Sequence, residues 1–222
     1  MNKLPKGCIF DLDGVICDTA KYHFLAWKKL AERLEIPFTE KENEMLKGVS
    51  RIDSLKILLS LKNILPKEEE LLRLADLKNN WYREYIQQIT PDELLEGVLE
   101  FIVTLKSHNI KIALGSVSKN APDILNSLNI TQYFDAVIDG NRVSRAKPDP
   151  EVFLSGAHEL MLDPKSCLVF EDAISGVKAA HNAGMKCIGV GDSSILSEAD
   201  YVIPGFGNFS YQNLEVLPFS FA

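Results

Sequence analysis

Apolar and polar positions fall into blocks along the chain, and from residue 95 onward these blocks follow a regular order. Short apolar runs predict strands, and they alternate with stretches of helical spacing such as 121–128 and 150–160. The predicted strands lie near residues 7–11, 110–115, 136–139, 167–170, 187–190 and 201–203. This alternation is typical of an α/β fold with a doubly wound parallel sheet and right-handed crossovers.

The segment from residue 17 to residue 90 has a different pattern, with helical spacing and no clear strand. Apolar and aromatic side chains recur at that spacing in two stretches. They are Tyr22, Phe24, Trp27, Leu30 and Leu34 in the first, and Leu71, Leu72, Leu74, Ala75 and Leu77 in the second. We therefore predict a helical cap domain over 17–90, inserted into an α/β core domain made of 1–16 and 91–222.

Two carboxylates follow the first predicted strand, at Asp11 and Asp13. In an open α/β sheet, ligands bind in the crevice over the carboxyl ends of the strands, so these side chains are candidates for chemistry. An Asp-x-Asp-Gly string taken alone more often makes a surface turn. This first motif therefore leaves both interpretations open.

Three later segments offer complementary chemistry. A predicted strand ends at Ser116, Lys147 stands beside a proline, and another strand ends in the pair Glu171 and Asp172. Taken singly, Ser116 is a turn serine and Lys147 a solvated lysine. In chain order, however, carboxylate, hydroxyl, lysine and carboxylate pair resemble the four signature motifs of the haloacid dehalogenase (HAD) superfamily of phosphotransferases. The resemblance implies a HAD-like core of the Rossmann type.

The resemblance also implies a role for each group. Asp11 would be the nucleophile that forms an aspartyl-phosphate, a covalent route open to carboxylates. Asp13 would be the general acid and base. Ser116 would hydrogen-bond the phosphoryl group in transfer, and Lys147 would offset the repulsion among the carboxylates.

A magnesium ion is the implied cofactor, because Mg²⁺ takes oxygen ligands and usually only one or two protein carboxylates. Asp11 and Asp172 fit this need. By resemblance, the Asp13 backbone carbonyl would be a further ligand, and Glu171 either a ligand or a supporting neighbour. Without a cation, four carboxylates at short range would repel one another by several kcal/mol.

Three further segments, 18–23, 47–54 and 116–120, resemble the β-phosphoglucomutase family of that superfamily. This resemblance implies reversible conversion of β-D-glucose 1-phosphate to glucose 6-phosphate through phospho-Asp11, with β-glucose 1,6-bisphosphate as the priming intermediate. The implied substrate contacts are Thr19, His23, Lys47, Gly48, Arg51, Ser54, Lys78, Val117, Ser118, Lys119 and Asn120.

A mutase that works through a bisphosphate needs a second phosphate site. Residues 118–120 precede a predicted helix, whose free N–H groups favour anions, and Arg51 offers a planar fork for two phosphate oxygens. The alternative for Arg51 is a solvent-facing helix residue. The resemblance makes His23, with Lys78, a candidate for linking cap closure to Asp13, and the alternative is a packing or surface role.

Two other functions stay open. A small-molecule phosphatase of the same superfamily would share every core motif, so only the cap segments and an assay for released phosphate separate it from a mutase. A non-catalytic phosphate-binding regulatory protein is the second alternative, and it would show no Mg²⁺-dependent turnover of any phosphate ester.

The composition of the chain limits the kinds of molecule that the protein is expected to bind. The 222 residues are 46% hydrophobic and 25% charged, as in an ordinary globular protein, and the net charge of −7 argues against non-specific nucleic-acid binding. No run approaches the roughly 18 apolar residues of a membrane span. Four cysteines without a Cys-x-x-Cys pair favour a reduced, cytoplasmic protein. We expect a monomer that binds hexose phosphates, with the apolar tail 216–222 packed on the core or on a partner.

Overall fold

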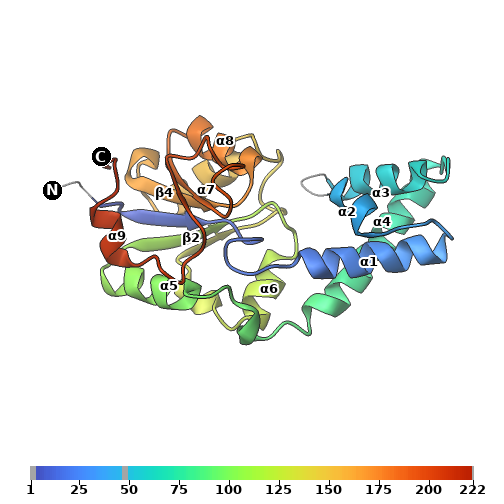
Figure 1. Ribbon diagram of the computed structural model, residues 1–222, viewed down its shortest axis with the longest axis horizontal. Helices are drawn as coiled ribbons and strands as arrows, with labels where there is room; N and C mark the ends of the chain where they lie inside the picture. The colour runs from blue at the N-terminus through green and yellow to red at the C-terminus, as the bar shows by residue number, and fades with distance from the viewer. Residues whose placement is uncertain (1–3, 47–49, 222) are drawn as a thin grey trace. The chain divides into compact units, whose positions relative to one another are not determined.

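The computed structural model describes residues 4–46 and 50–221 and divides the chain into two compact units (Figure 1). The core unit comprises Met1–Asp18 and Ile89–Ala222, and the cap unit comprises Thr19–Gln88. The domain limits at 16/17 and 90/91 inferred from the sequence stay a prediction.

The core unit is built on a six-stranded sheet. Its strands are β1 (Gly7–Phe10), β2 (Lys111–Gly115), β3 (Ala136–Ile138), β4 (Cys167–Glu171), β5 (Lys186–Val190) and β6 (Tyr201–Ile203). They lie in the order β3-β2-β1-β4-β5-β6, and every neighbouring pair is parallel. The predicted parallel α/β sheet is confirmed, and β1 lies inside it between β2 and β4.

Helices of the core unit lie between and after these strands. They are α5 (Val98–Ser107), α6 (Ala121–Ser127), α7 (Glu151–Glu159), α8 (Ile174–Asn182) and α9 (Tyr211–Glu215), with short 3₁₀ turns η1 (Pro91–Glu93), η2 (Thr131–Tyr133) and η3 (Pro164–Ser166). The predicted helices at 121–128 and 150–160 correspond to α6 and α7.

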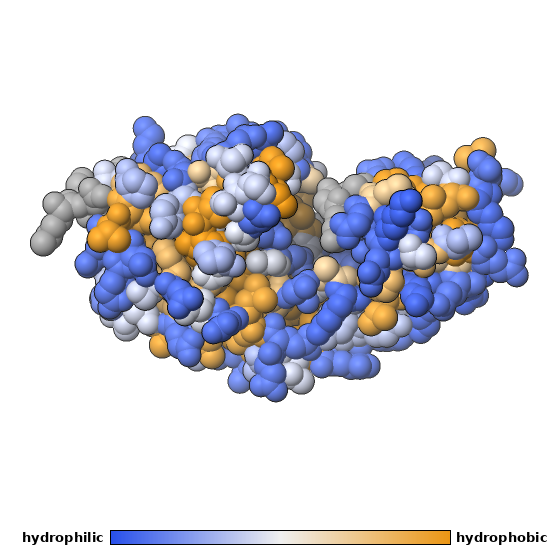
Figure 2. Space-filling view, in the orientation of Figure 1, coloured by the Kyte–Doolittle hydropathy of each residue, from blue (hydrophilic) through white to orange (hydrophobic). Residues whose placement is uncertain are grey.

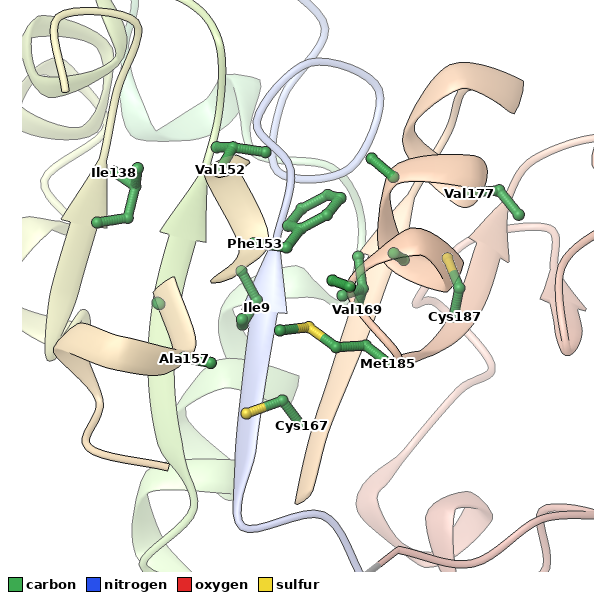
Figure 3. Packing of buried hydrophobic residues seen from close by; sticks show 14 of the residues in the cluster. Ile9, Ile138, Val152, Phe153, Ala157, Cys167, Val169, Val177, Met185 and Cys187 are labelled. Atoms are coloured by element: carbon green, nitrogen blue, oxygen red, sulfur yellow. The ribbon is translucent and has the colours of Figure 1, made fainter. Parts of the chain in front are cut away.

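Both faces of the sheet are covered, because successive side chains of a strand point to opposite faces. Ile9 of β1 packs in a buried cluster with Phe153 of α7 (Figure 3). Its neighbour Phe10 lies on the other face, where its ring stacks on Phe170 at 4.8 Å between centroids and meets the edge of Phe101 of α5. A sheet enclosed on both faces explains why its strands are apolar runs rather than alternating ones.

The described residues of the cap unit form helices joined by loops, with no strand among them, as predicted. Its helices are α1 (Ala20–Arg33), α2 (Glu40–Glu44), α3 (Arg51–Ser60) and α4 (Glu68–Ile86). Trp27 and Leu30 of α1, Leu55 of α3 and Leu74 of α4 belong to one buried cluster. The aromatic and leucine periodicity of this segment therefore forms a core of its own.

The apolar C-terminal tail lies on the core unit. Leu217 and Phe221 are buried, and the Lys186 ammonium lies 5.5 Å from the ring centroid of Phe219. Of the two locations left open by the sequence, the structure therefore shows the core.

The surface of both units carries hydrophilic side chains with apolar ones among them (Figure 2). Leu65 and Met161 are the most exposed of the large apolar side chains in the described residues. All four cysteines are buried and unbridged. Among the described helices, none combines the length and the apolar character that crossing a bilayer requires.

Candidate active site

Three carboxylates meet at one edge of the sheet. Asp11 follows β1, and its backbone N–H donates to the carbonyl of Phe170 on β4 at 3.0 Å. Because Phe10 and Phe170 are paired in register, the next residues on both strands emerge together. Carboxylate oxygens of Asp11, Glu171 and Asp172 lie within 4.8 Å of one another.

Lys147 bridges two of these carboxylates. Its Nζ lies 2.5 Å from Oδ1 of Asp11 and 2.7 Å from Oε2 of Glu171, and its side chain is 8% exposed. Burial disfavours the ammonium, but the charges of Asp11 and Glu171 outweigh it and hold the pKa of Lys147 above its usual range. Phe153 also contacts Lys147, with its ring centroid 4.8 Å from Nζ, a partner that the sequence analysis missed because the helical pattern shows only that Phe153 is apolar.

The cluster holds more negative charge than one lysine neutralises. Burial raises the pKa of Glu171, with Lys147 opposing and Asp11 adding to the rise. Burial and then the charge of Asp11 also raise the pKa of Asp172. A divalent cation would relieve this repulsion, and oxygen ligands alone are the chemistry that Mg²⁺ prefers. The donor set therefore fits the implied metal.

The loop after Asp11 approaches Asp172 closely at Gly14. This glycine has φ of 75°, and its N–H donates to the carbonyl of Cys17 at 2.8 Å. A Cβ at residue 14 would lie 2.1 Å from Oδ2 of Asp172, so a side chain there would displace the Asp172 carboxylate. The neighbouring Asp13 is part-buried, and its carboxylate is outside the three-carboxylate group.

The residue before α8 binds the carboxylate of Glu171. The backbone N–H of Ala173 donates to Oε1 of Glu171 at 3.1 Å. A Cβ at Gly176 would lie 2.0 Å from the Glu171 carboxyl carbon. The glycine after the acidic pair thus admits the carboxylate against the first turn of the helix.

Ser116 follows β2, the strand beside β1, and is 2% exposed. Its N–H donates to the carbonyl of Ile138 at 3.0 Å, and its Oγ accepts from the N–H of Ser118 at 3.1 Å. The strand order therefore brings the hydroxyl to the same sheet edge as Asp11.

The segment after Ser116 leads into α6, which begins at Ala121 as the sequence predicts. The N–H of Asn120 donates to Oγ of Ser118 at 3.3 Å. Asn120 is buried, whereas Lys119 and Val117 are exposed. The side chain of Val117 is 42% exposed in the core unit.

In the cap unit, Thr19, His23 and Lys78 surround Tyr82. The Tyr82 hydroxyl donates to Oγ1 of the buried Thr19 at 3.3 Å, and the rings of His23 and Tyr82 stack at 4.0 Å. Nζ of Lys78 lies 2.9 Å from Nδ1 of His23, and 4.5 Å from the ring centroid of Trp27. Lys78 is 1% exposed, so this is a buried cation with aromatic walls.

Arg51 is the first residue of α3 and is part-buried. Ser54, one turn further on, is buried, and its Oγ donates to the carbonyl of Leu46 at 3.4 Å. The predicted contacts Lys47 and Gly48 lie outside the described residues.

The cap gathers positive charge around His23. Burial, and then the charge of the nearby Arg51, lower the pKa of Lys78 to about 7. Burial, Lys78 and Arg51 together hold the pKa of His23 well below its usual value. These basic side chains repel one another, and a bound anion would relieve that repulsion.

Comparisons with known proteins agree with this geometry. Residues 8–190 match the family model of the haloacid dehalogenase-like hydrolases. The chain belongs to that family.

Within it, the chain is similar to a β-phosphoglucomutase of Bacillus subtilis, with 44% identity over 89% of this chain and 88% of the relative. A crystal structure of β-phosphoglucomutase from Clostridium difficile superimposes with a TM-score of 0.88 at 41% identity, covering 96% of both chains. A phosphorylated carbohydrates phosphatase of Thermotoga maritima is 34% identical over 81% of this chain and 82% of the relative.

Proposed function

We propose that this protein is a phosphotransferase that interconverts β-D-glucose 1-phosphate and glucose 6-phosphate through phospho-Asp11. The buried contact of Lys147 with both Asp11 and Glu171 carries the phosphotransfer part of the proposal, because it presents a carboxylate nucleophile beside a fixed cation. Similarity over almost the whole length to β-phosphoglucomutases supports the mutase part.

The first step is attack of Asp11 on a phosphoryl group, which forms the aspartyl-phosphate and releases the donor oxygen. Lys147 neutralises charge on the phosphoryl oxygens, and the Ser116 hydroxyl donates a hydrogen bond to one of them. Asp13 protonates the leaving oxygen and later deprotonates the hydroxyl that attacks phospho-Asp11.

Asp11, Glu171 and Asp172 would hold Mg²⁺ with the Asp13 backbone carbonyl, and the bound ion would supply charge stabilisation and orientation for the phosphoryl group. Gly14 and Gly176 leave room for the carboxylates of Asp172 and Glu171.

The mutase reaction also requires a site for the second phosphate of β-glucose 1,6-bisphosphate. We assign this role to Arg51, with residues 118–120 and Lys47. The guanidinium can take two phosphate oxygens at once. Thr19, His23 and Lys78 would couple anion binding to the position of Asp13, so that proton transfer begins only with a sugar phosphate in place. Gly48, Ser54 and Val117 would complete the contacts with the sugar.

A sugar-phosphate phosphatase is the second candidate, because the Thermotoga maritima relative is a phosphatase at 34% identity. The two candidates share the aspartyl-phosphate and differ only in the acceptor, which is a sugar hydroxyl in one and water in the other.

One coupled assay tests the choice. The protein receives β-glucose 1-phosphate, its α anomer or glucose 6-phosphate, each with Mg²⁺ and a catalytic amount of β-glucose 1,6-bisphosphate. We expect glucose 6-phosphate from the β anomer only, with little inorganic phosphate. Stoichiometric phosphate release from all three sugars would establish the phosphatase instead.

We also propose that the protein acts as a cytoplasmic monomer on small hexose phosphates. The buried, unbridged cysteines support a reducing compartment.

A further inference from the structure

The loop that carries Lys147 has no regular secondary structure, although its lysine makes two short ion pairs at the carboxylate cluster. Something outside the loop must therefore fix its backbone. The first turn of α7 does so through Glu151, a residue to which neither the motif analysis nor the mechanism assigns a role.

The carboxylate of Glu151 accepts hydrogen bonds from the loop upstream of Lys147. Oε2 accepts from the N–H of Arg145 at 2.8 Å and from the N–H of Ser144 at 3.0 Å, and the Ser144 hydroxyl lies 3.0 Å from the same oxygen. Bonds from backbone amides to a carboxylate are charge-assisted and therefore among the stronger ones. The donation from Ser144, and then from Arg145, lowers the pKa of Glu151 and keeps the carboxylate ionised at neutral pH.

The other side of Lys147 is fixed as well. The Asn182 side chain of α8 donates to the carbonyl of Pro148 at 3.0 Å, and Oδ1 of Asp149 accepts from the N–H of Glu151 at 3.0 Å. Phe153, two residues along α7 from Glu151, has its ring centroid 4.8 Å from the ammonium. The loop is thus hydrogen-bonded to α7 before Lys147 and to α8 after it.

We propose that Glu151 is a positioning residue for phosphoryl transfer, which fixes the backbone of residues 144–145 and thereby holds Lys147 on Asp11 and Glu171. This role rests on the proposed function of Lys147 and deepens it. Misplacement of a catalytic group by about 1 Å can cost about 10²-fold in rate, so a loose loop lowers kcat. In the proposed function the distal phosphate is bound by Arg51 and residues 118–120, which lie outside this loop, so KM should change much less.

The test compares Glu151→Ala and Glu151→Gln with Glu159→Ala. Glu159 lies on the same helix and pairs with Arg142 at 2.6 Å, but it makes no bond to residues 144–149. The control therefore removes the same charge and one ion pair without releasing the lysine loop.

The first measurement does not need catalysis. Acetic anhydride acylates accessible amines, and peptide mass analysis gives the rate at Lys147 in each variant. We expect Lys147 to react at least about fivefold faster in Glu151→Ala than in the unaltered protein, with Glu151→Gln between them and Glu159→Ala unchanged. Equal rates at Lys147 in all four proteins would overturn the inference, whatever the enzyme assay shows.

The second measurement is steady-state kinetics with β-glucose 1-phosphate. We expect Glu151→Ala to lower kcat at least about tenfold with KM within about threefold, and Glu159→Ala to stay within about twofold in both. Equal loss of kcat in Glu151→Ala and Glu159→Ala would contradict a positioning role. If the unaltered protein has no mutase activity and Lys147 is still acylated faster in Glu151→Ala, the anchoring would be supported and the proposed function alone would be overturned.

Discussion

The Lys147 ammonium donates to Oδ1 of Asp11 at 2.5 Å, so the proposed nucleophile is held by a cation before any substrate arrives. One carboxylate oxygen of Asp11 is therefore engaged with the lysine, and the other is the candidate for attack. Asp13, two residues later, is outside the carboxylate group.

This arrangement predicts different defects for two similar substitutions. Asp11→Asn should form no aspartyl-phosphate with any donor, because the nucleophile is gone. Asp13→Asn should still be phosphorylated by acetyl phosphate, whose leaving group needs no proton, while its turnover of β-glucose 1-phosphate falls about 10²- to 10⁴-fold. Acid-quenched labelling with peptide mapping measures both. A label on Asp11→Asn at any other residue would refute the assignment of the nucleophile.

The close approach of Gly14 to Asp172 predicts that a methyl group added at residue 14 weakens Mg²⁺ binding. In Gly14→Ala the new Cβ would displace Asp172, so we expect the Mg²⁺ concentration for half-maximal activity to rise at least about tenfold, as it should in Asp172→Ala. Titration calorimetry with Mg²⁺ measures the same change without turnover.

Gly184→Ala is the matched control for that substitution. Gly184 has φ of 74°, close to that of Gly14, but a Cβ there meets nothing within 4 Å. Both variants carry the left-handed backbone penalty of about 1 to 2 kcal/mol, and only Gly14→Ala should weaken Mg²⁺ binding. A similar Mg²⁺ response in both variants would show that backbone strain, and not the contact with Asp172, is responsible.

The sequence predicts the sheet well because its strands are apolar runs with turn residues at their ends. It places the end of β4 at residue 170, whereas the strand continues through Glu171, whose carboxylate is buried. A buried carboxylate is tolerable there because Lys147 and the N–H of Ala173 both donate to it. Those partners depend on the packing of a loop and a helix on the strand, which no local pattern expresses.

The same limit applies to Glu151. In the sequence it is one acidic residue at a helix start, where a carboxylate is expected for the helix dipole alone. Its bonds to Ser144 and Arg145 exist only because the chain turns back between them. Motif spacing identifies groups that act on a ligand, whereas groups that hold a loop in place become visible only in three dimensions.

The buried lysine of the cap predicts a pH dependence of stability. Burial lowers the pKa of Lys78 to about 7, whereas an unfolded lysine titrates near ~10.4. Between these values the unfolded chain binds more protons, so the free energy of unfolding rises with pH across the window from 7 to about 10. Lys78→Met removes this contribution. The variant should be more stable than the unaltered protein at pH 7, and this difference should shrink by about 2 kcal/mol from pH 7 to pH 9.

Urea unfolding followed by tryptophan fluorescence measures this effect in the cap, because the two tryptophans, Trp27 and Trp81, both lie in that unit. Lys56→Met, at an exposed lysine of α3, is the control and should give a difference from the unaltered protein that does not change with pH. An advantage of Lys78→Met that grows with pH would mean that Lys78 is stabilised as a cation in the folded cap.

Arg51 separates a mutase from a phosphatase through a residue outside the catalytic motifs. If it binds the distal phosphate through two N–H groups, lysine cannot replace its planar fork despite keeping the charge. Loss of one charge-assisted hydrogen bond, about 1.5 to 3 kcal/mol, corresponds to about 10- to 150-fold. Because binding energy from a remote phosphate can be used to align the reacting one, kcat/KM for β-glucose 1-phosphate should fall at least about tenfold in Arg51→Lys.

Acetyl phosphate has no distal phosphate, so phosphorylation of Asp11 by this donor should change much less in the same variant. Arg73→Lys, at an exposed arginine of α4 that pairs with Glu70 at 2.7 Å, controls for the loss of a guanidinium from the cap and should leave both reactions unchanged. Stopped-flow phosphorylation and the coupled mutase assay give the two rates for each variant. Equal losses with both donors, or none with either, would show that Arg51 does not grip the distal phosphate, and the case for a mutase over a phosphatase would then lose its support in the cap.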